Sequence, residues 1–254
     1  MRILRYSAEG AGASWGVLDG SRVERLQASP LAGELRRSGE RHELEAVTLL
    51  APTKPTKIIG VGRNYPAHAA EHNAPVPPEP LIFLKPPSSV IGPGQAIELP
   101  ALSGQVEHEG ELAVVIGRPG RRIPEAAALE HVAGYTAAND VTARDLQRGD
   151  PQWTRGKGFD TFCALGPWIE TALDLEGARL TCAVNDELRQ QGSPAEMVFS
   201  VPQLVAFISE VMTLETGDVI LTGTPAGVGP LAPGDVVTVV IEGLGALTNP
   251  VVSA

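Results

Sequence analysis

The sequence predicts a β-rich α+β fold. Short apolar runs rich in β-branched residues recur between glycine and proline turns, as in 81–85, 219–222 and 236–241, and such runs are typical of buried strands. They do not alternate with helices in the regular way that produces a parallel α/β sheet. One strong helix is predicted from Val201 to about Leu214, because Ser200 suits its N-cap and apolar residues recur along one face.

Composition indicates a globular protein and limits its partners. The 254 residues are 43% hydrophobic and 20% charged, which is enough to build a substantial core. The net charge of -10 argues against nucleic acid or an anionic membrane as the main partner, and an anionic substrate would need local positive charge. The sequence contains no apolar run of membrane-spanning length and no signal-peptide pattern at its start, so we expect a cytoplasmic protein.

Cys163 and Cys182 match no metal or redox spacing and are predicted to be buried free thiols.

Two domains are predicted. Residues 1–50 alternate strand patterns with turns, including a hairpin at Asp19-Gly20 and a short helix from Pro30 to Arg37. Two prolines in the small, polar run 51–56 break both regular structures and mark a linker. We therefore expect a small β-rich N-terminal domain over 1–52 and a larger domain over 53–254, which carries all the candidate chemistry.

Acidic side chains gather where a predicted strand begins. Glu109 and Glu111 are two positions apart at the start of the apolar run 112–116, so they point to the same side of the strand. Asp140 ends another apolar stretch and can add a third carboxylate. Keeping such carboxylates ionised beside each other is costly unless a cation or hydrogen bonds compensate, and a divalent metal is the simplest compensation. All-oxygen ligation favours Mg²⁺, Mn²⁺ or Ca²⁺ over zinc. A solvated acidic face is the alternative.

A histidine and a glutamate share one helical face. A buried strand over 57–62 leads to Pro66, which suits the first turn of a helix through about His72. His68 and Glu71 are three positions apart there, and a carboxylate that holds an imidazole is the usual arrangement for a general base. The proline-rich segment 73–80 would let this helix move as a lid. An exposed ion pair is the alternative.

Four further polar positions are candidates for contacting an anion. The segment 141–147 is predicted to be helical, which places Arg144 and Gln147 on one face near Asp140. Lys157 lies between two glycines, and an ammonium beside a metal site can hold a substrate anion. Thr224 lies in a glycine-rich loop after a strand, where its hydroxyl and the loop amides can face a carboxylate. A solvated lysine and a simple tight turn are the alternatives.

These residues fall into five ordered motifs, which together resemble the fumarylacetoacetate hydrolase family over about residues 55–245. The resemblance implies a mixed β-sheet roll of the fumarylacetoacetate hydrolase C-terminal type, a small N-terminal domain, a homodimer and a Mg²⁺ or Mn²⁺ site. The motifs are Gly62-Arg63-Asn64-Tyr65-x-x-His68, Glu109-Gly110-Glu111-Leu112, 139–145, Lys157-Gly158-Phe159-Asp160-Thr161 and Gly223-Thr224-Pro225.

The resemblance also implies a role for each candidate residue. The metal would be held by Glu109, Glu111 and Asp140. A dyad of His68 and Glu71 would activate water, and Lys157 would stabilise an enolate. Contacts to the substrate would come from Arg63, Tyr65, Arg144, Gln147 and Thr224.

The resemblance predicts a metal-dependent hydrolase that cleaves a carbon–carbon bond in a small anionic 2,4-dioxo acid of the acylpyruvate or fumarylpyruvate type. The alternatives within the family are a 2-hydroxyhepta-2,4-diene-1,7-dioate isomerase and a 2-oxo acid decarboxylase, with a role in aromatic catabolism. A catalytically silent binding protein on the same fold is the alternative from another class.

Overall fold

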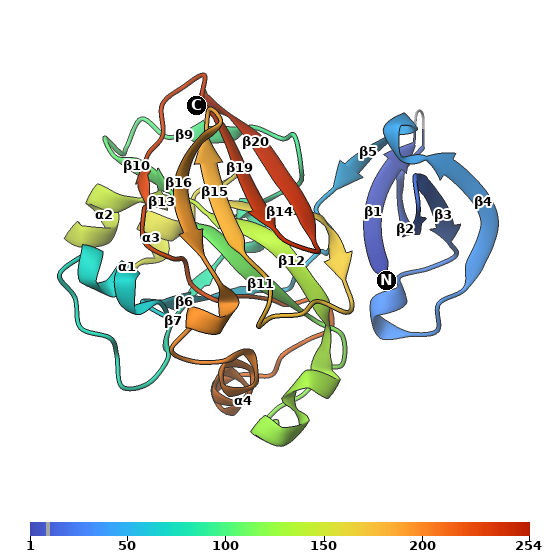
Figure 1. Cartoon of the computed structure of the whole chain (residues 1–254), viewed down its shortest axis with the longest axis horizontal. Helices are drawn as coiled ribbons and strands as arrows, with labels where there is room; N and C mark the ends of the chain where they lie inside the picture. Colours follow the sequence, from blue (N-terminus) through green and yellow to red (C-terminus); the bar gives the residue numbers. More distant parts are fainter. Residues whose placement is uncertain (9–10) are drawn as a thin grey trace.

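The computed structural model describes residues 1–8 and 11–254. The first 50 residues form a small antiparallel unit, which lies at the right in Figure 1, away from the larger body of the chain. Its strands are β1 (Arg2–Ala8), β2 (Ala13–Asp19), β3 (Arg22–Leu26), β4 (Arg37–Glu43) and β5 (Val47–Leu50). Strand β1 pairs with both β2 and β5, and Leu4, Tyr6 and Val23 are buried between them. The predicted turn at Asp19-Gly20 is present, with Gly20 in the left-handed region at φ 60°.

The predicted helix over 30–37 is wrong. The structure has one 3-10 turn there, η1 (Pro30–Ala32), and the chain then enters β4 at Arg37. The Ser29 side chain accepts a hydrogen bond from Leu31 N–H, which explains the helix-like start. The residues that follow have no apolar face to bury, so their backbone pairs with β3 instead, with Leu26 opposite Arg37.

The N-terminal unit continues into a sheet of 12 strands. Strand β1 pairs antiparallel with β14 through Arg2 opposite Glu170 and Ile3 opposite Ile169. The main path of the sheet runs β4-β3-β2-β1-β14-β12-β11-β17-β6-β7, and β8 pairs beside β14. The strands of the larger domain in this sheet are β6 (Ile58–Gly62), β7 (Leu81–Lys85), β8 (Val90–Ile91), β11 (Gly110–Ile116), β12 (Val132–Asp140), β14 (Cys163–Glu170) and β17 (Val219–Leu221).

A second sheet of five strands covers one face of the first, and its strands lie in front of β11, β12 and β14 in Figure 1. Its order is β16-β15-β19-β20-β9. Leu112 from the first sheet packs in one apolar cluster with Cys182 and Val239 from the second. The strands are β9 (Ile97–Leu99), β15 (Leu180–Val184), β16 (Glu187–Gly192), β19 (Val236–Ile241) and β20 (Gly245–Ser253), and a third small sheet holds β10 (Val106–His108), β13 (Thr142–Ala143) and β18 (Gly229–Pro230).

The predicted fold class is therefore confirmed: the protein is strand-rich, and its sheets mix parallel pairs such as β6/β17 with antiparallel ones. The helices are short: α1 (Pro66–Glu71), α2 (Arg144–Gly149), α3 (Thr154–Lys157) and α4 (Val201–Val211). The remaining one-turn or 3-10 segments are η2 (Leu44–Ala46), η3 (Pro87–Ser89), η4 (Glu125–His131) and η5 (Pro194–Glu196). Within the described part of the chain, no helix is both long and apolar enough to span a bilayer.

Two smaller predictions can be scored here. The helix predicted over 141–147 starts at Arg144, because Thr142 and Ala143 pair with β10 and extend the third sheet. Cys163 and Cys182 are buried free thiols, as predicted, and burial raises the pKa of each to about 12. Both cysteines are therefore protonated and unreactive at neutral pH.

Candidate active site

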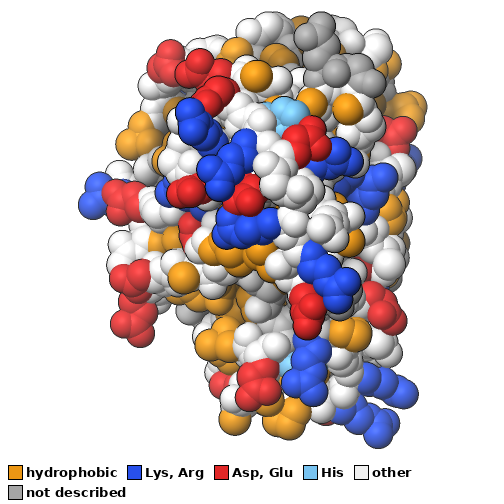
Figure 2. Space-filling view, turned by 90° about the vertical axis from the view of Figure 1, so that its right-hand side faces the viewer, with side chains coloured by type: hydrophobic (Ala, Val, Ile, Leu, Met, Phe, Trp, Pro, Cys, Tyr) orange, Lys and Arg blue, Asp and Glu red, His pale blue; other side chains and the backbone are white. Residues whose placement is uncertain are grey.

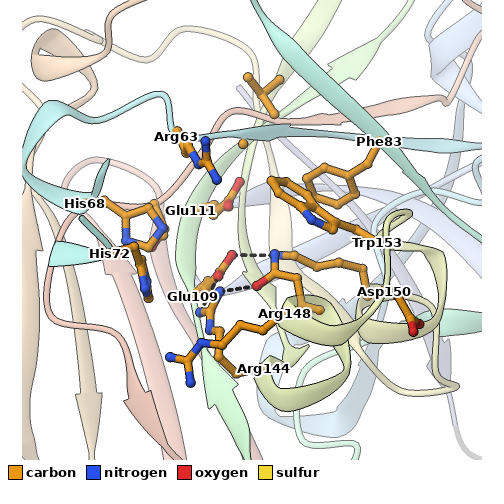
Figure 3. Close-up of a pocket in the computed structure, with 15 residues that line it drawn as sticks. Arg63, His68, His72, Phe83, Glu109, Glu111, Arg144, Arg148, Asp150 and Trp153 are labelled. Carbon is orange, nitrogen blue, oxygen red and sulfur yellow. Dashed lines mark hydrogen bonds and ion pairs between the residues drawn. The ribbon is translucent and has the colours of Figure 1, made fainter. Parts of the chain in front are cut away.

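A pocket of about 340 Å³ opens between α1, the α2/α3 region and the start of β11 (Figure 3). Most of the predicted site residues line it: Arg63, His68, Glu109, Glu111, Arg144, Gln147, Lys157 and Thr224. Phe83 and Trp153 form an apolar wall with ring centroids 5.4 Å apart, which the sequence argument did not anticipate. Asp140, Glu71 and Tyr65 are not among the lining residues.

The three predicted metal ligands lie close together, and two of them, Glu109 and Glu111, line the pocket. Glu109 joins β10 to β11, and Glu111 is the second residue of β11. Asp140 is brought beside them because β12 pairs with β11, and the Asp140 N–H donates to the Glu109 carbonyl at 2.9 Å. All three side chains are buried, and one oxygen from each lies within 4.8 Å of the others.

The charge environments of these carboxylates differ. Burial opposes ionisation of Glu109, but Lys157 and Arg144 hold its pKa below the usual range. Glu111 has one hydrogen bond, from Gly223 N–H at 2.8 Å, and no basic side chain pairs with it among the described residues. Burial, followed by the charges of Asp140 and Glu109, raises the pKa of Glu111 well above its usual value. No cation therefore balances the charge of Glu111 when the cluster is ionised. A divalent metal with oxygen ligands would supply that positive charge.

Two lysines hold Asp140 from opposite sides. Lys157 Nζ donates to Glu109 Oε2 at 2.6 Å and to Asp140 Oδ2 at 2.7 Å. Lys85 Nζ donates to Asp140 Oδ1 at 2.5 Å and to the Val141 carbonyl at 3.2 Å. Sequence reasoning missed Lys85, whose only signal was a charged residue at the end of the apolar run 81–85. A buried ammonium this close to a carboxylate fixes the carboxylate's orientation.

The Arg144 side chain spans the other side of the cluster. Its guanidinium donates to Glu107 Oε2 at 2.7 Å, to Glu109 Oε1 at 2.6 Å and to Gln147 Oε1 at 2.7 Å. Glu107 is a second buried acid that sequence reasoning did not single out. The three contacts hold the Arg144 plane in place and turn the Gln147 amide nitrogen away from it.

The predicted base lies on α1, at the left of Figure 3, facing Glu109 and Glu111. His68 Nδ1 lies 3.3 Å from Glu71 Oε2, while Glu71 Oε1 accepts from Gly227 N–H at 3.0 Å. Burial lowers the pKa of His68, so its imidazole is neutral at pH 7. A neutral imidazole with one nitrogen held by a carboxylate is prepared to accept a proton at the other nitrogen.

Three residues that were predicted to contact the substrate differ from one another in their access to the pocket. Thr224 lines the pocket, but its hydroxyl already donates to the Gly110 carbonyl at 2.8 Å and accepts from Gln190 at 2.7 Å. Tyr65 is 1% exposed and lies behind the pocket wall, so its contact with substrate stays a prediction. Arg63 has φ 57° and lines the pocket, and no carboxylate pairs with it within residues 1–8 and 11–254.

Comparison with known proteins identifies the family. Residues 57–252 match the family described as Fumarylacetoacetate (FAA) hydrolase C-terminal, and residues 1–52 match one described as Rv2993c-like, N-terminal. The chain therefore belongs to the fumarylacetoacetate hydrolase family, as its motifs predicted. Members of this family are enzymes and are in general dependent on a divalent metal, which agrees with the acidic cluster.

Individual relatives carry names of different reactions. Human mitochondrial oxaloacetate tautomerase FAHD2A is 48% identical over 219 residues, which span 81% of this chain and 70% of that protein. The structure of 5-carboxymethyl-2-hydroxymuconate delta-isomerase from Mycobacterium smegmatis matches with a TM-score of 0.93 at 46% identity, covering 100% of both chains. The structure of fumarylacetoacetate hydrolase from Exiguobacterium antarcticum matches with a TM-score of 0.90 at 40% identity, also over 100% of both chains.

Proposed function

We propose that this protein catalyses divalent-metal-dependent proton transfer beside the 2-oxo group of a small dicarboxylic acid, as a tautomerase or isomerase. The observation that carries the proposal is a neutral, buried imidazole, His68, on the same pocket as a carboxylate cluster in which Glu111 lacks a cation. The names of the tautomerase and isomerase relatives, at 48% and 46% identity, support this choice.

The site would hold Mg²⁺ or Mn²⁺ through Glu109, Glu111 and Asp140. The ion would supply Lewis-acid stabilisation of the negative charge that develops on the substrate's 2-oxygen. With the ion bound and Glu111 deprotonated, four carboxylates, the three ligands and Glu107, face three cationic side chains, Lys85, Lys157 and Arg144, and the side chains sum to one negative charge. A dication makes that total positive, so the loaded pocket attracts an anionic substrate.

In the proposed mechanism, His68 moves the proton. Its Nδ1 is held by Glu71, so Nε2 is the nitrogen that removes the proton from the carbon next to the 2-oxo group and returns it elsewhere. Glu71 stabilises the imidazolium that forms, and the Gly227 N–H keeps Glu71 in position. Lys157 is close enough to the cluster to stabilise the same developing negative charge as the ion.

The preference for a dicarboxylic acid comes from the outer part of the pocket. Arg63 and Arg148 both line it, and Figure 3 shows them on opposite sides of the carboxylate cluster. Neither guanidinium pairs with a carboxylate in the described part of the chain, so both are available to a second anionic group on the substrate.

Hydrolytic carbon–carbon cleavage, the first prediction from the sequence, is the second candidate. The hydrogen bond between His68 and Glu71 favours it, because the same pair would activate a water molecule as well as a carbon acid. The fumarylacetoacetate hydrolase relative, at 40% identity, supports it.

The two candidates differ in the fate of solvent oxygen. We expect the enzyme with Mg²⁺ to accelerate loss of the enol absorbance of oxaloacetate without cleaving it. An acylpyruvate and a dienoic diacid should be tested in parallel in ¹⁸O-water. Label in a released carboxylic acid identifies the hydrolase, whereas proton migration without label identifies the isomerase. No turnover of any of the three would overturn both candidates and favour a catalytically silent binding protein.

The homodimer predicted from the family resemblance stays a proposal. Light scattering at micromolar concentration should give twice the chain mass of 26.6 kDa, and a monomer would contradict it.

A further inference from the structure

The short helix that carries the proposed base presents a second group of metal-binding side chains. His68, Glu71 and His72 occupy positions i, i+3 and i+4, so all three lie on one side of the chain. His-x-x-Glu-His also occurs in one class of zinc enzymes, in which the two histidines bind zinc and the glutamate is the general base. One ligand atom from each side chain lies within 4.8 Å of the others. Spacing alone is weak evidence, so the argument rests on the surroundings of the two imidazoles.

The His72 ring has an unexplained nitrogen. Its Nε2 is buried and makes no hydrogen bond to any described residue, although the side chain lines the pocket. A buried nitrogen without a hydrogen-bond partner is energetically unfavourable, so the missing partner needs an explanation. Figure 3 shows His72 directly beside His68, and the ring centroids are 4.7 Å apart at 82°. A ligand held between the two rings would give the His72 nitrogen its partner.

The side chains of His68 and Glu71 are also positioned to bind a metal. The His68 ring is buried, and its Nδ1 lies 3.3 Å from Glu71 Oε2, so one ion can take both atoms as ligands in place of their hydrogen bond. Glu71 is held from behind by Gly227 N–H and is 32% exposed, which leaves a path for an ion from solvent. Hydrogen bonds that orient a ligand residue in this way are typical of metal sites. Burial also keeps both imidazoles neutral, which is the form that binds metal.

We propose that His68, His72 and Glu71 form a second metal site, selective for zinc and chemically distinct from the acidic cluster. Two imidazole nitrogens and one carboxylate suit Zn²⁺, Co²⁺ or Ni²⁺, whereas the three carboxylates of Glu109, Glu111 and Asp140 suit Mg²⁺ or Mn²⁺. One consequence rests on the proposed function: an ion held between His68 Nδ1 and Glu71 removes the hydrogen bond that positions the base. Zinc is therefore an inhibitor of the magnesium-loaded enzyme.

The test is a cobalt titration of the full-length protein with excess Mg²⁺, which keeps the acidic cluster occupied. Co²⁺ absorbs visible light strongly in the four-coordinate geometry that a zinc-type site with two imidazoles favours, and only weakly in the six-coordinate geometry of an all-oxygen site. We expect one equivalent of absorbing Co²⁺ in the wild type and in Glu111→Ala. His72→Leu should lose it, with zinc affinity measured by calorimetry falling about 100-fold, the upper end of what disturbing a metal shell costs. His42→Leu, on the N-terminal domain, is the matched control and should behave as wild type.

The outcomes separate the site from the catalytic proposal. Unchanged cobalt absorption in His72→Leu, or its loss in Glu111→Ala alone, would overturn the second site. In an activity assay with Mg²⁺, micromolar zinc should inhibit the wild type and not His72→Leu. If neither protein turns over substrate, the proposed function fails while the cobalt result still decides the metal site.

Discussion

Ion pairs of similar length occur in two regions of this molecule and differ in burial. On the outer face of the N-terminal domain, shown in Figure 2, basic and acidic side chains are intermixed and open to solvent. Arg22 and Glu43 are 2.8 Å apart there, with side chains 61% and 54% exposed. In the pocket, Lys157 and Glu109 are 2.6 Å apart and at most 5% exposed.

The distance between two charged groups therefore does not measure how much their ion pair contributes to stability or to the geometry of the site. Water and salt screen the exposed pairs, whose contribution to stability is small. Burying an ion pair costs desolvation free energy, and removal of one partner leaves a buried charge that nothing nearby compensates. The fold therefore gains little from either set as pairs, but the buried set fixes the orientation of the carboxylates that would bind a metal.

The largest expected effect is at Glu111, the buried carboxylate without a cation. Glu111→Ala should abolish Mg²⁺ binding in calorimetry and reduce turnover to background, because the cluster loses one of three ligands. Glu43→Gln, which removes an exposed acid, should change neither quantity. Wild-type Mg²⁺ affinity in the Glu111 variant would contradict the assignment.

The same residue predicts how Mg²⁺ affinity depends on pH. Because the pKa of Glu111 is raised, the metal-free protein holds a proton there that must leave when the ion binds. Affinity should rise with pH up to that raised value, and calorimetry in buffers of different ionisation enthalpy should detect proton release. Binding that is independent of pH above the normal glutamate range would argue against it.

The next effect concerns His68. His68→Gln should lower kcat by about 10²- to 10⁴-fold, the usual contribution of a general base. Burial lowers the pKa of His68 from 6.5, so the neutral base persists to lower pH, and activity should fall only as pH drops through a value below 6.5. The pH profile of kcat/KM in the wild type measures that value. A fall in kcat/KM that already begins above pH 6.5 would indicate that another group is the base. His42→Gln is the matched control.

A stability effect is expected at Lys85. Lys85→Met keeps most of the side-chain volume but leaves Asp140 with Lys157 as its remaining cationic partner. Breaking a buried pair costs about 3–5 kcal/mol, and we expect the lower end of that range. Urea unfolding in EDTA measures the loss, and added Mg²⁺ should recover part of it. A variant as stable as wild type would show that Lys85 does not compensate Asp140.

Local sequence patterns indicated which candidate side chains share a face, but they misassigned one segment of the N-terminal domain, for a physical reason. Glu109 and Glu111 are linked by strand alternation, and His68 and Glu71 by helical spacing, so short stretches indicate which side chains share a face. Lys85 and Glu107 reach the site only through packing of β7 and pairing of β10, which no local pattern reveals.

The errors have a related cause. The segment after Pro30 has a helix-like start but no apolar face, and its structure is decided by the partner strand β3. In the motif around 62–68, sequence cannot tell which side chains face the pocket. Arg63 lines it, whereas Tyr65 is buried and is not among the lining residues, and no local pattern distinguishes the two.

The smallest effect is expected at the exposed pair of Arg22 and Glu43. Arg22→Met should lower the free energy of unfolding by at most about 1 kcal/mol, because both side chains are largely solvated. In 1 M NaCl the Debye length falls to about 3 Å, so this difference should shrink further, whereas the deficit of Lys85→Met should persist because buried charges are screened much less. Urea titrations of the two variants at low and high salt measure both trends. Equal losses at low salt, or equal sensitivity to salt, would show that burial does not separate the two sets of ion pairs in this molecule.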